Sequence, residues 1–370
     1  MKILQLGKFY PIVGGVEKVM LDLTTGLSQS GVPCDMLCAE AKKGVGDVKL
    51  NDNATIFCVP TVKKLCATMI APRMITRLRS ICRDYDIIHV HHPDPMAALA
   101  LRLSGYEGRV VLHWHSDILK QRHLLKLYQP LQTWLLKRAD IIFGTSPIYL
   151  AESPFLKDVQ SKCKCLPIGI LPVPEADAED VDRIRQRYHD KKIIFSLGRL
   201  VHYKGYQYLI DAARQLPDDY VVAIGGGGQL HDELQQQIDS CGLGQKVTLL
   251  GRVADCELPA WFHACHLFCL SSIQKTEAFA IVQAEAMSCG KPIVATKIKG
   301  SGVSWVNQHG TSGLNVEPAN ATALAQAIRQ ICENPSLYQQ LAQGALKRYQ
   351  QTFTMEKMME NYRKELKIDN

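Results

Sequence analysis

The chain has no long apolar run. No stretch of its 370 residues approaches the roughly 18 consecutive apolar side chains that a membrane-spanning helix needs. The segment Met1–Leu6 carries Lys2 and is broken by Gly7 and Lys8, so it lacks the apolar middle region of a signal peptide. We therefore expect a cytoplasmic protein.

Cysteine pairs with the spacing of a metal site are also missing. The 13 cysteines include no Cys-x-x-Cys pair, and neither Cys163 with Cys165 nor Cys265 with Cys269 has the spacing of a structural zinc site. In a chain without an export signal, scattered cysteines indicate reduced, mostly buried thiols. With 46% hydrophobic and 21% charged residues and no low-complexity tract, the composition is that of a soluble globular protein.

Acidic residues do not balance the basic ones in the first half of the chain. Residues 1–170 hold 22 Lys and Arg against 14 Asp and Glu, whereas the remainder holds 21 against 22. Such a basic face with apolar neighbours suits an anionic membrane surface, and equally a solvated helix face over a core. No nucleic-acid-binding motif accompanies the charge. The basic residues lie in two stretches: Lys63, Lys64, Arg73, Arg77, Arg79 and Arg83, then Lys120, Arg122, Lys126, Lys137 and Arg138.

Strand-like apolar runs alternate with longer helical patterns. Strands are predicted at 3–6, 87–90, 110–113, 141–144, 193–197, 220–224, 247–250, 267–270 and 292–295, and helices at 16–29, 95–104, 119–137 and from about 320 onward. This alternation predicts an α/β fold with parallel sheets covered by helices. The proline-rich segment 167–174 and the acidic run 175–182 are interpreted as a linker. We expect two Rossmann-like domains, 1–170 and 171–350, facing a central cleft.

Two carboxylates mark the most informative segment of the chain. Glu277 is expected in a strand-to-helix loop, and Glu285 about one turn into the helix that follows, at 281–288. A helix start offers unpaired backbone N–H groups and a positive dipole end, which suits an anionic or hydroxyl-rich ligand. The carboxylates would accept hydrogen bonds from ligand hydroxyls.

Two cations follow the strand predicted at 193–197. Arg199 and Lys204 are five residues apart in a loop, where both could clamp a diphosphate, although such a pair is by itself usually solvated surface charge. Combined with the carboxylates in the same half, the pair indicates a phosphate-and-sugar site of the kind that a nucleotide sugar requires.

Gly14 and Gly15 lie where the first strand turns into the first long helix. Their backbone N–H groups could approach a phosphate closely. A structural turn explains the pair equally well, because the dinucleotide-binding pattern G-x-G-x-x-G is absent there. The four glycines 225–228 need only form a tight turn.

His115 is the candidate site residue of the first half. It follows the strand at 110–113, and it could accept a proton from a sugar hydroxyl or steady positive charge through its backbone carbonyl; a hydrogen-bonded core histidine is the alternative. The sequence Asp84-Tyr85-Asp86 looks like a D-x-D metal signature but more plausibly caps the following strand. The group His89, His91 and His92 is interpreted as structural, because alternate strand positions face opposite sides. No metal site is predicted.

In order and spacing, the motifs GGVE at 14, HSD at 115, GRLVHYKG at 198 and EAFAIVQAEAMSCGKPIVAT at 277 resemble the retaining GT-B glycosyltransferases of family 4. The resemblance covers nearly the whole chain. It implies that the first domain, completed by a C-terminal helix at 351–370, binds the acceptor and that the second binds a nucleotide sugar.

The resemblance also implies roles for single residues. His115, Arg199, Lys204 and Glu277 would be catalytic, with Arg199 and Lys204 on the diphosphate and Glu277 on the sugar hydroxyls. Glu285 would bind the ribose. The remaining donor-binding residues would be Gly14, Gly15, Gly251, Arg252, Ala278, Phe279, Ala280 and Val282. Many relatives carry glycine where this chain has Ala280.

The implied reaction is hexosyl transfer with retention of configuration, by front-face attack in which the leaving phosphate takes the acceptor's proton. No cofactor or essential metal is expected. The phrases HWHSDILKQRHLLKLYQPLQ and TEAFAIVQAEAM look like bacterial enzymes of O-antigen or exopolysaccharide assembly, often mannosyl or rhamnosyl transferases. These imply a UDP- or GDP-linked donor and a lipid-diphosphate-linked glycan acceptor at the inner face of the plasma membrane. The alternatives are an epimerase or glycan phosphorylase of the same fold, or a non-catalytic sugar-nucleotide-binding module.

Overall fold

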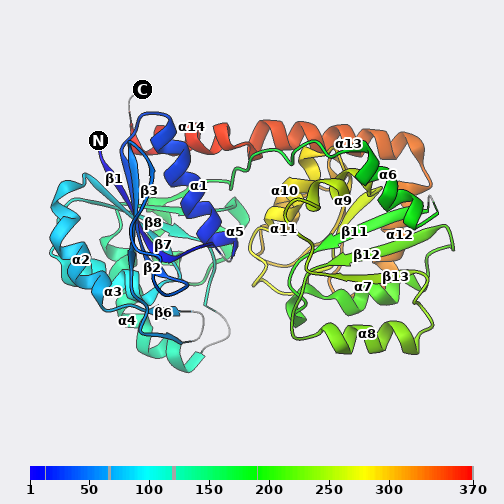
Figure 1. The fold of residues 1–370 in the computed structure, drawn as a ribbon, viewed down its shortest axis with the longest axis horizontal. Coiled ribbons are helices and arrows are strands. Elements are labelled where there is room, and N and C mark those ends of the chain that lie inside the picture. The colour runs from blue at the N-terminus through cyan, green and yellow to red at the C-terminus, as the bar shows by residue number, and fades with distance from the viewer. Residues whose placement is uncertain (13, 66–67, 119–121, 190, 369–370) are drawn as a thin grey trace. The chain divides into compact units, whose positions relative to one another are not determined.

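The computed structural model divides the chain into two compact units (Figure 1). The first contains Met1–Ile168 and Met355–Asn370, and the second contains Gly169–Thr354, so the divisions lie within a few residues of those expected at 170 and 350. The structure describes residues 1–370 except 13, 66–67, 119–121, 190 and 369–370. No helix within these described ranges is long and apolar enough to cross a bilayer.

The first unit is built on an eight-stranded sheet in the order β10-β9-β8-β7-β1-β2-β4-β3, parallel except for β3. Ile3 pairs with Cys34 on one side and with Ile87 on the other, so β1 lies at the centre. A separate antiparallel pair, β5 (Lys63–Leu65) with β6 (Thr68–Ile70), follows β4. The sheet strands are β1 (Ile3–Tyr10), β2 (Cys34–Glu40), β3 (Val48–Asn51), β4 (Ala54–Val59), β7 (Ile87–His92), β8 (Arg109–Trp114), β9 (Ile141–Gly144) and β10 (Cys163–Cys165).

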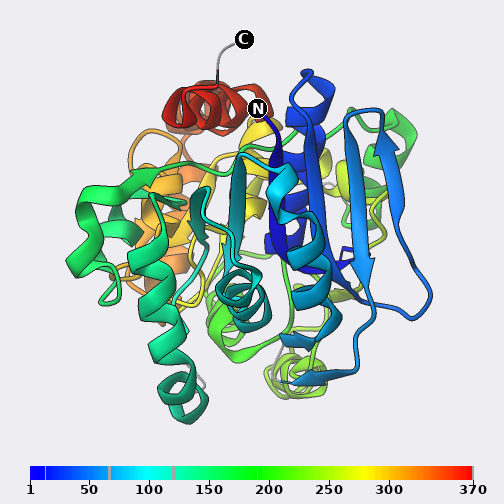
Figure 2. The same ribbon diagram turned by 90° about the vertical axis from the view of Figure 1, so that its left-hand side faces the viewer.

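Helices cover both faces of this sheet. Figure 2 shows α2 (Arg73–Ile81), α3 (Pro95–Ser104) and α4 (Arg122–Arg138) side by side in front of it. Helix α3 begins where Asp94 accepts hydrogen bonds from the amides of Met96 and Ala97, and it ends at Gly105, whose φ of 75° is left-handed. The short α5 (Pro147–Glu152) follows β9.

The second unit has a six-stranded parallel sheet in the order β13-β12-β11-β14-β15-β16. Its helices pack in groups, α7 with α8 and α12, α6 with α9, and α10 with α13. The strands are β11 (Lys192–Leu197), β12 (Tyr220–Gly225), β13 (Val247–Gly251), β14 (Leu267–Leu270), β15 (Ile293–Thr296) and β16 (Gly313–Val316). The helices are α6 (Ala178–Arg187), α7 (Tyr206–Ala213), α8 (His231–Ser240), α9 (Leu258–Ala264), α10 (Ile281–Ser288), α11 (Val303–Val306), α12 (Ala321–Cys332) and α13 (Pro335–Arg348).

The predicted α/β class with two Rossmann-like parallel sheets is confirmed, and some details differ. The acidic run 175–182 is only partly linker, because α6 begins at Ala178, with Asp177 accepting a hydrogen bond from the amide of Glu179. Acidic residues at a helix start offset the positive dipole end, and this explains the run. Residues 119–121 of the helix predicted at 119–137 lie outside the described residues, and α4 begins at Arg122.

The last helix, α14 (Met355–Leu366), belongs to the first unit and lies against α1 (Gly15–Gln29) (Figure 1). A Cβ at Gly26 would come within 2.8 Å of Sδ of Met359, so the glycine permits this close approach. The fully buried Tyr362 places its hydroxyl 3.0 Å from Nδ1 of His89. The final segment of the chain thus completes the core of the first unit.

Replacing Tyr362 with phenylalanine should lower the unfolding free energy of the first unit by about 1–3 kcal/mol, because Nδ1 of buried His89 loses its partner. Urea denaturation of a variant that keeps only Trp114 and Trp134, which report on the first unit, would measure the loss. Lys364→Ala, at an exposed position of the same helix, is the control. Equal stability of the two variants would contradict a structural role for this hydrogen bond.

Candidate functional site

The main candidate site lies in the second unit, where the strand order reverses. Strand β11 pairs with β12 on one side and with β14 on the other, so the connections after β11 and β14 leave the sheet in opposite directions. In parallel sheets, ligands bind outside the carboxyl ends of the strands at such a point. The loop after β11 carries Arg199 and Lys204, and the loop after β14 carries Glu277.

Lys204 and Glu277 form a buried ion pair at this point. Nζ of Lys204 lies 2.6 Å from Oε2 of Glu277, and each residue is only 8% exposed. Ser272 donates a second hydrogen bond to the same carboxylate oxygen, at 2.8 Å. Burial alone would lower the pKa of Lys204. The carboxylate of Glu277, together with the side chains of Tyr206 and Tyr203, outweighs burial and raises that pKa. The ammonium group therefore stays charged at neutral pH.

The path of the Lys204 side chain depends on two glycines. A Cβ at Gly198 would lie 2.9 Å from Cε of Lys204 and 2.9 Å from the hydroxyl of Tyr206. Gly205, with a φ of 66°, ends the turn His202–Lys204, and a Cβ there would clash with the carbonyl oxygen of Ser271. The hydroxyl of Ser271 donates to the Lys204 carbonyl at 2.9 Å, which ties the two loops together.

Arg199, in contrast, is exposed, and its guanidinium donates a 3.2 Å hydrogen bond to the hydroxyl of Tyr203. Its loop runs along the glycines that follow β12: the amide of Leu200 donates to the Gly227 carbonyl at 2.9 Å. A Cβ at Gly226 would clash with the carbonyl oxygen of Gly198. The glycine run therefore does more than turn the chain, since it lets the Arg199 loop lie directly on the β12 connection.

The segment from Glu277 to α10 is held by hydrogen bonds that its backbone carbonyl groups accept from Ser301 and Gly302. The amide of Gly302 donates to the Ala278 carbonyl at 2.9 Å, and the hydroxyl of Ser301 donates to the Glu277 carbonyl. Phe279 is buried. Ala280 precedes α10 with a φ of 63° and a ψ of 79°, in the left-handed region that favours glycine.

The other predicted donor-binding residues of this unit lie along the same sheet edge or in α10. Val282 and Glu285 are half-buried in α10, in its first turn and one turn further on. Gly251, with a φ of 68°, ends β13 and is followed by the exposed Arg252. Strands β13 and β14 are three positions apart, so the ends of these strands lie on the order of 14 Å apart along the edge.

In the first unit, four buried histidines from neighbouring strands form a stack. His89 and His91 come from β7, and His113 and His115 from β8 and the residue after it. The rings of His113 and His115 are 4.0 Å apart at 9°. His92 faces the other side of the sheet and stacks on Trp114 at 3.7 Å, as strand alternation predicts.

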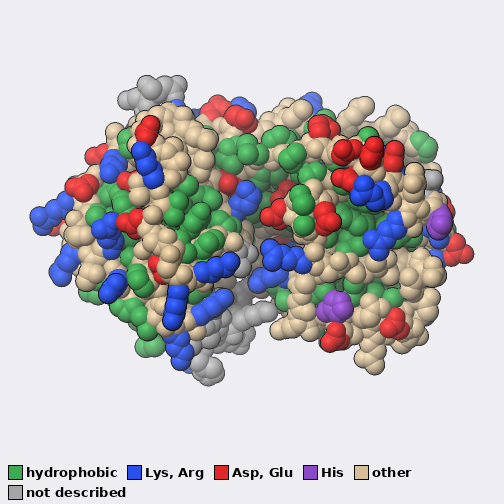
Figure 3. All heavy atoms as spheres, in the orientation of Figure 1, with side chains coloured by type: hydrophobic (Ala, Val, Ile, Leu, Met, Phe, Trp, Pro, Cys, Tyr) green, Lys and Arg blue, Asp and Glu red, His purple; other side chains and the backbone are tan. Residues whose placement is uncertain are grey.

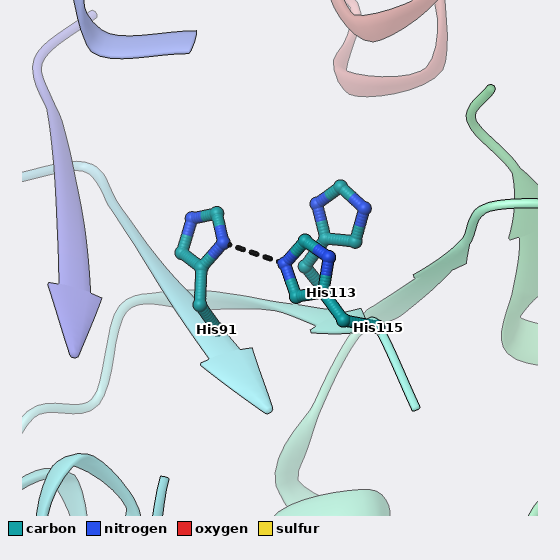
Figure 4. A group of neighbouring side chains, drawn as sticks. All are labelled: His91, His113 and His115. Atoms are coloured by element: carbon teal, nitrogen blue, oxygen red, sulfur yellow. Dashed lines mark hydrogen bonds between the residues drawn. The ribbon is translucent and has the colours of Figure 1, made fainter. Parts of the chain in front are cut away.

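Hydrogen bonds fix the tautomer of His115. Nε2 of His91 lies 2.7 Å from Oε1 of Gln5, which only accepts, so this nitrogen carries the proton of neutral His91. Nδ1 of His91 therefore accepts from Nε2–H of His115 at 2.9 Å (Figure 4). Burial lowers the pKa of His115, so it too is neutral. Its Nδ1 is consequently unprotonated and makes no hydrogen bond within the described part of the chain.

The stack does not have the geometry of a metal centre. One ring nitrogen from each of His91, His113 and His115 lies within 4.8 Å of the others (Figure 4). A ligand nitrogen directs its lone pair in the ring plane, and nearly parallel rings 4.0 Å apart cannot direct two such lone pairs at one ion about 2 Å away. The arrangement favours a hydrogen-bonded stack.

Gly14 and Gly15 are exposed at the start of α1, after β1. Gly14 is the N-cap residue and no side chain caps this helix end. A Cβ at Gly14 would lie 2.7 Å from Oε2 of Glu17, so the glycine leaves room for the buried carboxylate of the first turn. This is a structural reason for the Gly-Gly pair that does not depend on a phosphate.

Sequence reasoning missed the residues that hold the candidates in place. Ser272 and Ser271 brace the Lys204–Glu277 pair, and Gln5 and His91 orient His115. No pattern in the sequence marks Gln5, because its partner is 86 residues away. The two serines directly follow a buried strand, and this position at the carboxyl edge of a sheet was the available signal.

Two family descriptions match the chain, "Glycosyltransferase Family 4" over residues 13–159 and "Glycosyl transferases group 1" over residues 177–348. The O-antigen chain mannosyltransferase C of Escherichia coli is 31% identical over 367 residues, which cover 98% of this chain and 97% of that protein. D-rhamnosyltransferase WbpZ of Pseudomonas aeruginosa is 30% identical, over 96% of this chain and 92% of that protein. The chain belongs to the GT-B glycosyltransferases of the family 4 type.

Solved structures agree with this glycosyltransferase fold over its whole length. Anabaena HepE in complex with UDP superposes with a TM-score of 0.80 at 22% identity, covering 99% of this chain and 100% of that one. Sucrose-phosphate synthase from Thermosynechococcus elongatus gives a TM-score of 0.80 at 19% identity, covering both chains fully. At these identities the likeness establishes the fold of the glycosyltransferase.

Ala280→Gly should raise the unfolding free energy of the second unit of the glycosyltransferase by roughly 0.5–1 kcal/mol. Relief of the left-handed backbone strain exceeds the added entropy of glycine in the unfolded chain. Ala286→Gly, in the middle of α10, should destabilise the unit by about 1 kcal/mol. Thermal unfolding of both variants measures the difference, and a destabilised Ala280→Gly variant would show that Ala280 is not strained.

The first unit should lose stability in mild acid. Burial lowers the pKa of His92 and of His113 to about 3, and it also lowers the pKa of His89, His91 and His115. The unfolded chain protonates these rings near pH 6.5, whereas the folded unit does not. Stability is therefore complete above pH 6.5 and falls as the pH drops toward the folded pKa, by up to about 1.4 kcal/mol per pH unit for each histidine.

Urea unfolding of the first unit at pH 7.5 and pH 5.5 should differ by about 7 kcal/mol for the five histidines together. His113→Gln should flatten this pH dependence by one proton, and His231→Gln, at an exposed position of the second unit, should leave it unchanged. A first unit equally stable at both pH values would mean that the histidines are protonated in the folded state.

Proposed function

We propose that the enzyme transfers a hexose, with mannose favoured, from a nucleotide diphosphate sugar to a lipid-linked glycan with retention of anomeric configuration. The observation that carries this proposal is the buried Lys204–Glu277 pair beside the exposed Arg199 at the reversal of the second sheet. Two cations for a diphosphate and a carboxylate for sugar hydroxyls are the recognition groups that such a donor needs.

The proposed chemistry assigns one task to each group. Arg199 and Lys204 supply fixed positive charge where the leaving diphosphate becomes more negative, which is the largest single term in many enzymes. Glu277 accepts hydrogen bonds from the sugar hydroxyls and keeps Lys204 protonated. The leaving phosphate takes the proton of the attacking hydroxyl on the same face of the sugar. No step requires a metal or a cofactor.

The choice of donor and acceptor rests on similarity. The relatives with the greatest coverage are a mannosyltransferase of the O-antigen chain and a D-rhamnosyltransferase. HepE was solved with UDP and with UDP-glucose. These likenesses support a UDP- or GDP-linked hexose and an acceptor of cell-surface polysaccharide assembly. Glu285, Gly251, Arg252 and Val282 would bind the nucleoside, and Gly14 and Gly15 would contact the diphosphate.

We also propose that the first unit attaches to the inner face of the plasma membrane by charge. On α2, Met74 and Leu78 are buried, whereas Arg73 and Arg79 are exposed. Arg77 pairs with Asp47 at 3.1 Å and lies over the ring of Phe57. Because the apolar side of α2 packs on the core, this helix would contact anionic headgroups without inserting. Residue 120 of the second basic stretch lies outside the described residues.

Glu277→Gln and Lys204→Ala should each lower transfer by about 10²–10³-fold, because each removes charge from the donor site. Turnover would be followed with a panel of UDP- and GDP-linked hexoses, and nucleotide binding by thermal shift, since a ligand at 100 times its Kd stabilises by about 2.7 kcal/mol. Lys204→Ala leaves Glu277 buried without its partner and should also cost stability. The double variant Lys204→Met/Glu277→Gln removes both charges and separates loss of folding from loss of activity.

Arg329→Ala is the matched control, because it breaks the exposed Arg329–Glu333 pair of the same unit and should leave transfer unchanged. Wild-type turnover by folded Glu277→Gln would refute the site assignment. Nucleotide-sugar binding without any transfer by the wild type would favour the non-catalytic binding module instead.

A further inference from the structure

A lysine-lined hollow lies in the first unit, away from the groups discussed so far. It has a volume of about 310 Å³ and is lined by residues at the ends of β1 and β2, in the segment directly after β2, and in the segment after β4, which includes the β5–β6 pair. Four of them are lysines: Lys42 and Lys43 after β2, and Lys63 and Lys64 after β4. Figure 3 shows Lys and Arg side chains gathered on this part of the unit, near β6.

The four ammonium groups have no counter-ions of their own. All four lysines are exposed, and none of their ammonium groups makes an ion pair or hydrogen bond with another described residue. Glu40 is the acidic residue in the lining, and its carboxylate accepts hydrogen bonds from the amides of Gly44 and Gly46 at 3.3 and 3.2 Å. Like charges around one hollow repel each other, and an anion in the hollow would relieve that repulsion.

Hydrogen bonds fix the backbone segments that surround the hollow. Thr61 donates a 2.6 Å hydrogen bond to the Glu40 carbonyl, which fixes the segment after β4 to the segment after β2. The amide of Ala41 donates to the Tyr10 carbonyl at 2.8 Å, and that of Val62 to the Ile70 carbonyl at 2.8 Å. The backbone on each side of the lysines is therefore held in place.

The lining also has an apolar part. Val62 is 77% exposed, and Phe9 and Met69 are half-buried beside the lysines. A phosphate alone would gain nothing from such a surface, whereas the hydrocarbon next to a lipid phosphate would cover it.

The hollow lies at the same edge of the sheet as the predicted site residues of the first unit. It lies at the carboxyl ends of the strands, the same edge at which Gly14, Gly15 and His115 leave the sheet. Strand β4 is two positions from β1, so the ends of these two strands lie on the order of 10 Å apart, and Phe9 of β1 itself lines the hollow. A short glycan attached to a group held in the hollow would reach that part of the edge.

We propose that this hollow binds the diphosphate of a prenyl-diphosphate-linked acceptor, with the lysines on the phosphates and the apolar lining against the first prenyl carbons. The proposal rests on the proposed function, since it names the acceptor chemistry. It assigns Lys42, Lys43, Lys63 and Lys64 to acceptor binding and not to the reaction itself.

Farnesyl diphosphate, titrated by calorimetry into the full chain, is the probe. Saturating UDP or GDP occupies the donor site, which would otherwise also bind a diphosphate. Lys42→Ala/Lys43→Ala and Lys63→Ala/Lys64→Ala should each raise the Kd for farnesyl diphosphate by about tenfold or more. Lys63→Arg/Lys64→Arg should restore binding. Lys157→Ala/Lys164→Ala, which removes two exposed lysines near the opposite edge of the sheet, should bind like the wild type.

Unchanged binding of farnesyl diphosphate by both alanine variants would overturn the proposal. So would selective loss of binding to phosphatidylglycerol vesicles, because the lysines would then serve bulk membrane lipid. If neither UDP nor GDP binds the wild type, the proposed function fails. Binding to the hollow is then measured separately, by titrating farnesyl diphosphate without nucleotide into Lys204→Ala protein with and without the lysine substitutions.

Discussion

The buried ion pair of Lys204 and Glu277 is the constraint on which the second unit depends. Taking two charges out of water is costly, and their attraction repays the cost only with good geometry and further hydrogen bonds. The pair meets this condition through Ser272, which donates to the carboxylate, and Ser271, which holds the Lys204 backbone. Gly198, Gly205 and Gly226 then become obligatory, because side chains there would displace the lysine or its loop. Two apolar side chains of similar volume would stabilise this core at least as well as the ion pair. The charges therefore favour a role in binding a ligand.

The first unit handles its polar core in the opposite way. It buries four histidines in a stack and keeps them neutral, and it orders them by hydrogen bonds from Gln5 through His91 to His115. One unit therefore holds fixed charge at the end of its sheet, and the other holds neutral rings, of which His91 and His115 have a fixed tautomer. Under the proposed function this division is chemically reasonable, since the donor's leaving group is a diphosphate and the acceptor's reacting group is a hydroxyl.

Much of the fold and of the candidate site was predictable from sequence, and the features that were missed have physical causes. The central strands were found because parallel strands buried on both faces are continuous apolar runs. β2 was missed because Asp35 interrupts it; this carboxylate is buried, pairs with Lys2, and accepts hydrogen bonds from Tyr85 and the amide of Thr55. Arg199, Lys204 and Glu277 were predicted as candidate site residues because a strand precedes each loop. The ion pair between Lys204 and Glu277 was not predicted, because it depends on which strands are neighbours in the sheet.

The tautomer of His115 narrows what this residue can do in the proposed reaction. Burial and the neighbouring rings lower its pKa, so at neutral pH its ring is uncharged and is a weak base. Nδ1 carries a lone pair, because Nε2–H is committed to His91. The ring can therefore accept a hydrogen bond from a sugar hydroxyl and orient it, but it is poorly suited to remove the proton. In front-face transfer that proton must go elsewhere, and the leaving phosphate, whose basicity grows as its bond to the sugar breaks, is the group that takes it. In the proposed mechanism a neutral His115 of fixed tautomer would orient the acceptor hydroxyl, and the charges of Arg199 and Lys204 would stabilise the leaving phosphate.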